Sequence, residues 1–417
     1  MTAEPPAPPP ARTGSTLSPL AHNAFLLLWL SSLTSNTGNA IQVVGASWLM
    51  TSMTGSAAMV ALVQTATSLP FMLFALVGGA AADLHDRRRI MLATQVVMAA
   101  ISILLAVLVG LHLVSPWTLL GLTLALGVGA AFFNPAFAAS TGDSVPRSEL
   151  PGAVSLNILG FNASRAVGPA IGGAIVALGG SLAAFVAAAG AYLVAVVLVL
   201  RRPASAPDER TDKPSMGRAI LDGLAYVRQT GPIRVVLLRA VAFTLTGVAA
   251  WALMPLIARD LTGGGPSQFG LLLGALGLGA VFGAAASHAI RRRFSQETIT
   301  SAGGALYGAA CLLITLQPGL YATAALLVIG GAGWVQALSG FSVAGQMLSP
   351  RWVVGRVTAA VSAVTYGGLA IGSWAWGHVA EVAGLKVAIA ASGGAMVLLP
   401  LLGLLFPMPR HEGTAKT

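Results

Sequence analysis

The sequence predicts an all-α membrane protein, with twelve transmembrane helices in two pseudo-symmetric six-helix halves, and three observations support this fold class. Of the 417 residues, 56% are hydrophobic and 9% are charged, whereas a soluble domain carries about 25% charged residues. Uncharged runs such as 182–200 and 387–406 approach the roughly 20 apolar residues that a helix needs to cross a bilayer. A membrane β-barrel would instead show alternating strands of about ten residues. The third observation is an internal repeat.

The repeat appears when the chain is shifted by 204 residues. Residues 79–89 then fall on residues 283–293, so that two arginine triplets coincide, and Pro146-Arg147 falls on Pro350-Arg351. These matches are informative because charged residues are rare in this chain. Internal repeats of this kind are typical of carriers in which one half rocks against the other. The repeat therefore predicts two homologous halves.

Turn residues such as Thr54-Gly55, Ser115-Pro116 and Gly179-Gly180 separate the apolar segments. The expected spans are residues 24–49, 58–82, 90–113, 117–141, 153–178, 182–200, 235–258, 268–289, 296–316, 320–345, 357–380 and 387–406. The expected organisation is a disordered cytoplasmic tail (1–21), an N-terminal six-helix half (22–200), a cytoplasmic linker with an interfacial helix (201–234), a C-terminal half (235–406) and a cytoplasmic tail (407–417).

The basic residues predict the orientation. If both termini are cytoplasmic, nineteen of the 23 Lys and Arg residues lie in inner loops and tails, and only Arg259 and Lys386 lie in outer loops. This asymmetry predicts a multi-pass protein of the cell (inner) membrane. The net charge of +10 suits contact with anionic lipid headgroups. Nucleic-acid binding is not expected, because no basic patch belongs to a soluble domain.

The linker and the lone cysteine suggest no further chemistry. Residues 201–218 are polar and contain three prolines, and residues 218–230 place apolar side chains on one helical face, as in a helix that lies on the membrane surface. Cys311, the only cysteine, lies in an apolar run. A metal site, a cofactor and an intrachain disulfide are therefore not expected.

The loop between the second and third spans is the first candidate functional site. Gly79 would permit close helix approach, Asp83 could lie beside a helix N-terminus, and Arg87 and Arg88 could close a charge cluster. Such a cluster would hold the cytoplasmic side shut in one state and break in the other. The alternative is that the arginines only set the topology. The second copy carries Ser287 in place of Asp83, so a weaker latch is expected there.

The fifth span carries Arg165, which lies about twelve residues, or roughly 18 Å, into the helix. A cation at this depth costs about 2.5 kcal/mol or more, and no Asp or Glu lies deep inside any expected span. Arg165 should therefore face a central cavity, where water, Asn162, helix carbonyls or an anionic substrate group could be its partner. A purely structural role is the alternative.

Further polar residues could line the same cavity. Asn36, Asn39 and Gln42 share one face of the first span, and Asn134 and Gln336 lie in the fourth and tenth spans. For each of them, a hydrogen bond that holds two helices together is an equally good interpretation. Three ionisable residues have a simpler interpretation: Arg239 should extend to the inner surface, and His378 with Glu381 should form a solvated outer rim.

After Arg165, the fifth span continues with a Gly-Pro-x-x-Gly-Gly string. Its glycines should thin the helix and its proline should bend it, which allows a neighbouring helix to approach closely. The alternative is a packing feature with no bearing on transport direction. The residues of the string are Gly168, Pro169, Gly172 and Gly173.

These motifs resemble the major facilitator superfamily, whose signature after the second span is G-x-x-x-D-R/K-x-G-R/K-R/K. Gly79, Asp83, Arg87 and Arg88 match, whereas Leu84 and Asp86 depart from it. The Gly-Pro-x-x-Gly-Gly string is similar to the fifth-span motif of exporters in the superfamily. The first span and the segment 145–157 most resemble a bacterial group that includes the enterobactin exporter.

The resemblance implies a monomeric, non-enzymatic secondary transporter that exports small drug-like or siderophore-like molecules by alternating access and proton exchange. Asn39 stands where relatives often carry Asp, so proton antiport depends on the resemblance alone. Facilitated diffusion and coupling through substrate protonation stay open. An importer of small organic solutes and a non-transporting membrane sensor or subunit are the competing functions.

Overall fold

The computed structural model describes residues 17–202, 225–350 and 353–408, and within these ranges the chain forms helices and no strand. The predicted tails lie largely outside the described residues, although Ser18–Ala21, inside the expected first tail, form a 3-10 turn against α1 and α5. Most of the predicted linker and surface helix also lies outside them, and the description resumes inside a helical segment at 225–229.

The first half begins each helix where polar and proline residues favour a helix start. Ser56 and Ser115 accept hydrogen bonds from backbone N–H groups in the first turns of α2 and α4, as N-cap residues do. Gly180 (φ 69°, ψ −175°) breaks α5 between the predicted fifth and sixth spans, in the left-handed region that glycine tolerates. The helices are α1 (Asn23–Met53), α2 (Ala57–Leu84), α3 (Arg87–Gly110), α4 (Pro116–Gly142) and α5 (Leu150–Arg201).

The second half is more irregular at its start. The predicted seventh span is divided into α7 (Gly231–Gly247), α8 (Ala249–Ala252), α9 (Met254–Leu256) and a π-helical turn (Ile257–Leu261), around Pro255, which cannot donate a helical hydrogen bond. The remaining elements are α10 (Pro266–Arg293), α11 (Gln296–Ile314), α12 (Leu320–Met347), α13 (Val354–Ala383), α14 (Leu385–Leu398), a 3-10 turn (Leu399–Leu401) and α15 (Leu402–Leu405).

The helix inventory confirms the predicted fold class. Nine helices in the described part of the chain are long and apolar enough to cross a membrane. One of them, α5, covers two predicted spans, and α1 and the broken segment from α7 to the π-helical turn cover the other two. The observed helices are therefore consistent with twelve spans.

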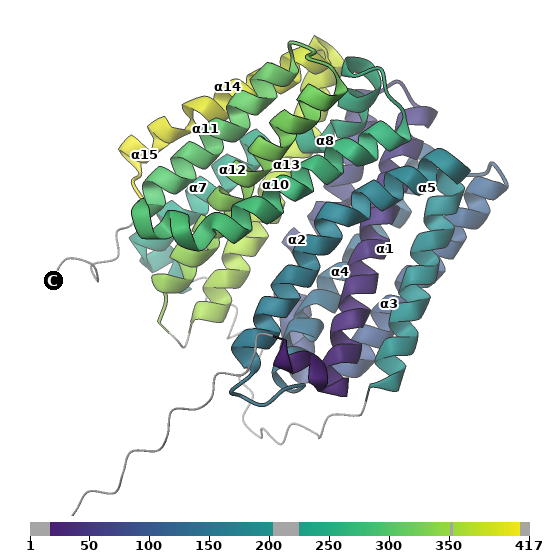
Figure 1. The fold of residues 1–417 in the computed structure, drawn as a ribbon, viewed down its shortest axis with the longest axis vertical. Helices are drawn as coiled ribbons and strands as arrows, with labels where there is room; N and C mark the ends of the chain where they lie inside the picture. Colours follow the sequence, from purple (N-terminus) through teal and green to yellow (C-terminus); the bar gives the residue numbers. More distant parts are fainter. Residues whose placement is uncertain (1–16, 203–224, 351–352, 409–417) are drawn as a thin grey trace, which may run out of the picture.

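Helices α1–α5 and α7–α15 form two bundles that lie beside each other (Figure 1). The bundles meet mainly along two helix pairs, α5 with α10 and α2 with α13. Small residues let these helices approach closely. A Cβ atom placed on Gly173 of α5 would lie 2.6 Å from the Cα of Gly270 on α10. On Gly277, it would lie 2.6 Å from the Cα of Ala166.

The two ends of the helical bundle differ in charge. We call the end where α2 ends and α3 begins the basic end, because it carries the arginine triplets 87–89 and 291–293. The other end, where α1 ends and α2 begins, is called the opposite end; Arg259 and Lys386 lie there. The described basic residues of the loops are thus divided between the ends as the sequence predicts.

Candidate functional site: a cavity between the two halves

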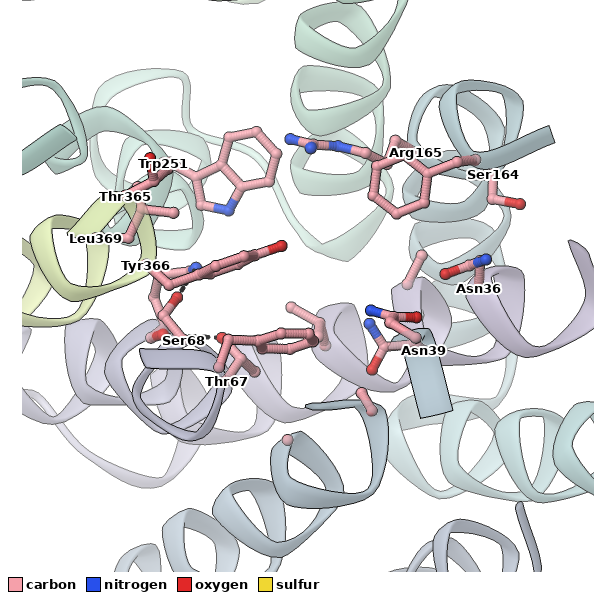
Figure 2. Close-up of a pocket in the computed structure, with 18 of the residues that line it drawn as sticks. Asn36, Asn39, Thr67, Ser68, Ser164, Arg165, Trp251, Thr365, Tyr366 and Leu369 are labelled. Atoms are coloured by element: carbon pink, nitrogen blue, oxygen red, sulfur yellow. Dashed lines mark hydrogen bonds between the residues drawn. The ribbon is translucent and has the colours of Figure 1, made fainter. Parts of the chain in front are cut away.

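A cavity of about 650 Å³ lies between the two bundles and is lined by both of them. Helices α1, α2, α3, α4 and α5 contribute from the first half, and α8, α10, α12 and α13 from the second. This volume lies within the range of roughly 300–1,000 Å³ that is usual for small-molecule sites. Figure 2 shows the side chains that surround it.

Arg165 faces this cavity from α5 and remains exposed within it. Its guanidinium carbon lies 5.6 Å from the ring centre of Phe161 and 5.1 Å from that of Trp251, within the distance of cation–π attraction. Trp251 belongs to α8, so this contact joins the two halves. No carboxylate lines the cavity among the described residues, which leaves Arg165 as the charged group of the site.

Five of the six predicted polar residues also line the cavity: Asn36, Asn39, Gln42, Asn134 and Asn162. Asn36 donates to the carbonyl oxygen of Ser32 at 2.8 Å, and Gln42 is buried and accepts from the Ser102 hydroxyl at 3.2 Å. The amide of Asn39 makes no hydrogen bond to another described residue. Asn39 is therefore open to a ligand.

Gln336, the sixth polar residue, does not line the cavity. It is buried inside the second half, where its amide nitrogen donates to the Gly283 carbonyl at 3.0 Å and its amide oxygen accepts from Ser287 at 3.0 Å. These bonds hold α12 to α10. At this position, the structure favours the helix-joining alternative.

Aromatic residues form a part of the lining that the sequence analysis missed. Phe71 of α2 and Tyr366 of α13 stack with ring centres 4.6 Å apart and planes 17° apart, and Phe161, Trp251 and Trp334 also line the cavity. A helical signal existed for two of them. Phe71 lies two turns after Gln64, another polar residue of the lining, and Phe161 lies one turn before Arg165.

The glycines of the fifth-span string face two different helices. A Cβ atom on Gly168 would lie 2.6 Å from the Cβ of Ala40, and one on Gly172 would lie 3.1 Å from the Cα of Ile41, both on α1. Gly173 faces α10 in the other half. The backbone stays helical through Pro169, and the non-helical residue inside α5 is Gly180.

At the basic end, the predicted arginines bind within the first half. Arg87 donates to the carboxylate of Asp143, at the end of α4, at 2.6 Å. Arg88 donates to the carbonyl oxygens of Val199 and Leu200, at the end of α5, at 3.3 Å and 2.6 Å. The cluster thus ties the start of α3 to α4 and α5, and the sequence analysis did not identify Asp143.

The other two members of the predicted gate are less informative. Asp83 lies in the last turn of α2, and its side chain is outside the described part of the structure. A Cβ atom on Gly79 would meet nothing within 4 Å, whereas one on Gly78 would lie 2.7 Å from the Ala131 carbonyl oxygen. The close approach of α2 and α4 therefore occurs at Gly78.

At the opposite end, the second half holds the hairpin between α1 and α2 by two charged side chains. The Glu381 carboxylate accepts hydrogen bonds from the Ser56 hydroxyl at 2.9 Å and the Ala58 N–H at 3.1 Å. Arg259 donates to the Thr51 carbonyl at 3.1 Å. An anion thus lies at the N-terminus of α2 and a cation at the C-terminus of α1, as the helix dipoles favour.

These contacts show which end of the cavity is closed. A further hydrogen bond between the halves joins Thr65 to the Ala370 carbonyl at 2.9 Å, and it also lies in the part of α2 nearer the opposite end. The cavity lining continues toward the basic end along Ile158 and Ser342. The opposite end is closed.

Two halves around a central cavity that is closed at one end define a membrane carrier. The chain belongs to the transmembrane secretion effector family of the major facilitator superfamily, because the model of that family matches residues 14–417. It is a transporter and not an enzyme. In the residues that the structure describes, no group of three or more His, Cys, Asp or Glu side chains could hold a metal ion.

Relatives and solved structures agree with this assignment. The chain is 27% identical to the multidrug efflux pump Tap of Mycolicibacterium fortuitum over 93% of its own length and 96% of that protein. It is 26% identical to macrolide efflux protein A of Streptococcus pyogenes over 61% and 66% of the two chains. A variant of the nucleoside transporter NupG has the same fold, with a TM-score of 0.77 and 11% identity over 92% of this chain and 100% of that one. A bacterial homologue of the human lysosomal transporter Spinster, in an inward-facing and occupied conformation, gives a TM-score of 0.72 and 15% identity over 94% and 96% of the two chains.

Proposed function

We propose that this protein exports small drug-like molecules from the cytoplasm by alternating access. The observation that carries the proposal is the cavity of about 650 Å³ between the halves, which is lined by aromatic rings, amides and one arginine and is closed at the opposite end. The names of the relatives, a multidrug efflux pump and a macrolide efflux protein, support export of drug-like cargo. One chain completes the cavity, which supports a monomer as the working unit.

We place the basic end and both termini in the cytoplasm and the protein in the inner membrane. The support is the strong excess of arginine at that end, since positively charged loops stay on the cytoplasmic side during insertion. With this orientation, the closed opposite end faces away from the cytoplasm. Cargo would enter from the cytoplasm and leave after the halves rock to close the basic end.

Arg165 would bias the cavity toward neutral or anionic cargo. A cationic molecule would meet an uncompensated positive charge in a site of low dielectric constant, where like charges repel strongly. An anionic group would remove the cost of that charge. Asn36, Asn39, Asn134 and Asn162 supply additional hydrogen-bonding groups, which suits polar aromatic and siderophore-like molecules.

We propose proton exchange as the energy source, and this rests on the family resemblance. In the described part of the chain, no carboxylate lines the cavity, so the proton carrier would be a group outside the cavity or the cargo itself. Facilitated diffusion is the competing possibility. Asp83, a member of the proposed gate at the end of α2, is the acidic residue that could take part in the coupling.

A transport assay with an imposed pH gradient tests both the export and the coupling. Purified protein in liposomes would be given fluorescein, Nile red and ethidium as anionic, neutral and cationic aromatic dyes. We expect saturable transport of at least one of the first two dyes, accelerated by an opposing proton gradient and reduced by a protonophore. Transport that ignores the gradient would disprove proton exchange. Absence of saturable transport for all three would contradict the proposed cargo.

Variants at the two ends should shift the conformational balance in opposite directions. Glu381→Ala removes two hydrogen bonds to an exposed carboxylate, which solvent screening reduces to about 0.2–1 kcal/mol, so the population with the opposite end closed should fall by up to about fivefold. Asp83→Asn should weaken the proposed latch at the basic end and favour the state described here. Lys386→Gln, at the same end as Glu381, is the control.

Spin-label distances can follow this balance. Labels at Ser52 and Val382, exposed residues of the two halves, report on the opposite end, and labels at Ser148 and Phe294 report on the basic end. Cys311 would first be replaced by serine. Equal distance distributions in wild type and Glu381→Ala would show that this contact does not hold the opposite end closed.

A further inference from the structure

We propose that Arg165, Trp251 and Tyr366 form a subsite that binds an aromatic ring carrying a carboxylate. The inference rests on the proposed function, because the subsite lies in the proposed transport cavity, and it specifies which chemical group the cavity selects. Figure 2 shows the three side chains around one open space, with Trp251 and Tyr366 on one side and Arg165 on the other.

The guanidinium of Arg165 is covered on its faces and open at its edge. The ring centres of Phe161 and Trp251 lie 5.6 Å and 5.1 Å from the guanidinium carbon. Arg165 donates no hydrogen bond to any other described residue. A guanidinium has five N–H donors arranged as a planar fork. A carboxylate matches this fork with two parallel hydrogen bonds. The missing partner of Arg165 is therefore an oxyanion of the cargo.

The rings beside the guanidinium provide the second half of the subsite. Tyr366 is held by stacking on Phe71, with ring centres 4.6 Å apart, and its hydroxyl makes no hydrogen bond within the described residues. The ring of Trp251 is held in place by its contact with the Arg165 guanidinium. Aromatic side chains bind planar rings by offset or edge contacts. A cargo ring would contact Trp251 or Tyr366 while its carboxylate reaches Arg165.

The origin of the three residues gives this subsite a specific consequence. Arg165 comes from α5 of the first half, whereas Trp251 and Tyr366 come from α8 and α13 of the second half. An aryl carboxylate would thus contact both halves at once. A cation of the same shape would lose the hydrogen bonds and meet the charge of Arg165, so charge would decide selection among molecules of equal size.

Equilibrium binding of three naphthalene compounds tests the subsite. Purified full-length protein in nanodiscs would be titrated by calorimetry with 2-naphthoate, 2-naphthalenemethanol and 2-naphthylmethylamine, which share one ring system and differ in charge. In the wild type, we expect naphthoate to bind about tenfold more tightly than the alcohol, as one charge-assisted contact implies, and the amine to bind most weakly. Equal binding of the three compounds would overturn the proposal without any variant.

Variants of Arg165 and Trp251 show which residue causes the preference for naphthoate. Arg165→Gln should abolish the advantage of naphthoate over the alcohol, whereas Arg165→Lys, which keeps the charge but not the fork, should retain part of it. Trp251→Leu should weaken all three compounds to a similar extent. A preference for naphthoate that survives in Arg165→Gln would also overturn the proposal.

The binding assay separates this inference from the proposed function, because it needs neither a gradient nor a direction. A protein that binds naphthoate through Arg165 but transports nothing would retain the subsite and refute the export. A protein that exports other dyes but shows no charge preference among the naphthalenes would refute the subsite and leave the export standing.

Discussion

Replacement of Gly173 by leucine is expected to abolish transport while both helical halves remain folded. A Cβ atom at this position would lie 2.6 Å from the Cα of Gly270 and 2.8 Å from the carbonyl oxygen of Pro266. Both are backbone atoms of α10, so no side-chain rotation can relieve the overlap. Overpacking of this kind costs about 1–3 kcal/mol, and a whole leucine side chain adds to it. The two halves would be forced apart at this crossing. The conformation in which the opposite end is closed could then no longer form.

The chain offers a matched control for this prediction. Gly190 lies on the same helix, and a Cβ atom there would meet nothing within 4 Å, so Gly190→Leu should transport like the wild type. Gly270→Leu, on the facing helix, should reproduce the defect of Gly173→Leu. Dye transport in liposomes and the distance between labels at Ser52 and Val382 are the measurements. Wild-type transport by Gly173→Leu would mean that the tight crossing is not needed for the cycle.

Local patterns were enough to predict the helices. Hydrophobic length, turn residues and the repeat indicated the spans, and the break at Gly180 falls on the predicted Gly179-Gly180 turn. The irregular seventh span was not predicted. Its sequence is mostly apolar, with Arg239 as the one charged residue between 235 and 258, and Pro255 is a weak signal, because membrane helices tolerate proline when neighbours satisfy the freed backbone groups.

Local patterns predicted only some of the residues that line the cavity. The helical period places Asn36, Asn39 and Gln42 on one face, and all three line the cavity. The same period cannot tell whether a polar face meets a cavity or a neighbouring helix. Gln336 shows this limit, since the Gly283 carbonyl on α10 lies within its reach. That proximity depends on how two helices distant in sequence cross.

Contacts between the halves were the least predictable feature. Trp251 reaches Arg165 only because the broken seventh span brings α8 to the cavity, and Glu381 reaches Ser56 only because α13 lies beside α2. Each side chain on its own is ordinary in the sequence. Arg165 was the exception, because a cation deep inside an expected span, with no Asp or Glu deep inside any other, can be recognised from the sequence alone.

Loss of the carboxylate partner of Arg239 is expected to lower the stability of the protein strongly. The sequence suggested that Arg239 extends to the inner surface, but the structure buries it, with 4% of its side chain exposed, and pairs it with Glu297 of α11. The same carboxylate accepts hydrogen bonds from the Met408 N–H at 2.7 Å and the Ser301 hydroxyl at 2.9 Å. The Glu297 carboxylate thus binds groups of α7, of α11 and of the segment after α15.

Glu297→Ala leaves Arg239 buried without this partner, and removing one member of a buried ion pair costs about 3–5 kcal/mol. We expect a large fall in melting temperature. It can be measured by the intrinsic fluorescence of the protein in detergent. Ser301→Ala, which removes one neighbouring hydrogen bond, should cost only about 1 kcal/mol. A melting temperature of Glu297→Ala equal to that of Ser301→Ala would contradict the assigned burial.

A double variant separates the two origins of this cost. If the penalty comes from the uncompensated charge, then Arg239→Met combined with Glu297→Met should recover most of the stability, because apolar replacement of a buried pair is often neutral. If the penalty comes from the lost attachment of the segment at Met408, the double variant should stay as unstable as Glu297→Ala. Neither residue lines the cavity, so the folded fraction of each variant should still bind naphthoate with the wild-type charge preference. Stability and cargo selection would then depend on different arginines, Arg239 inside the second half and Arg165 between the halves.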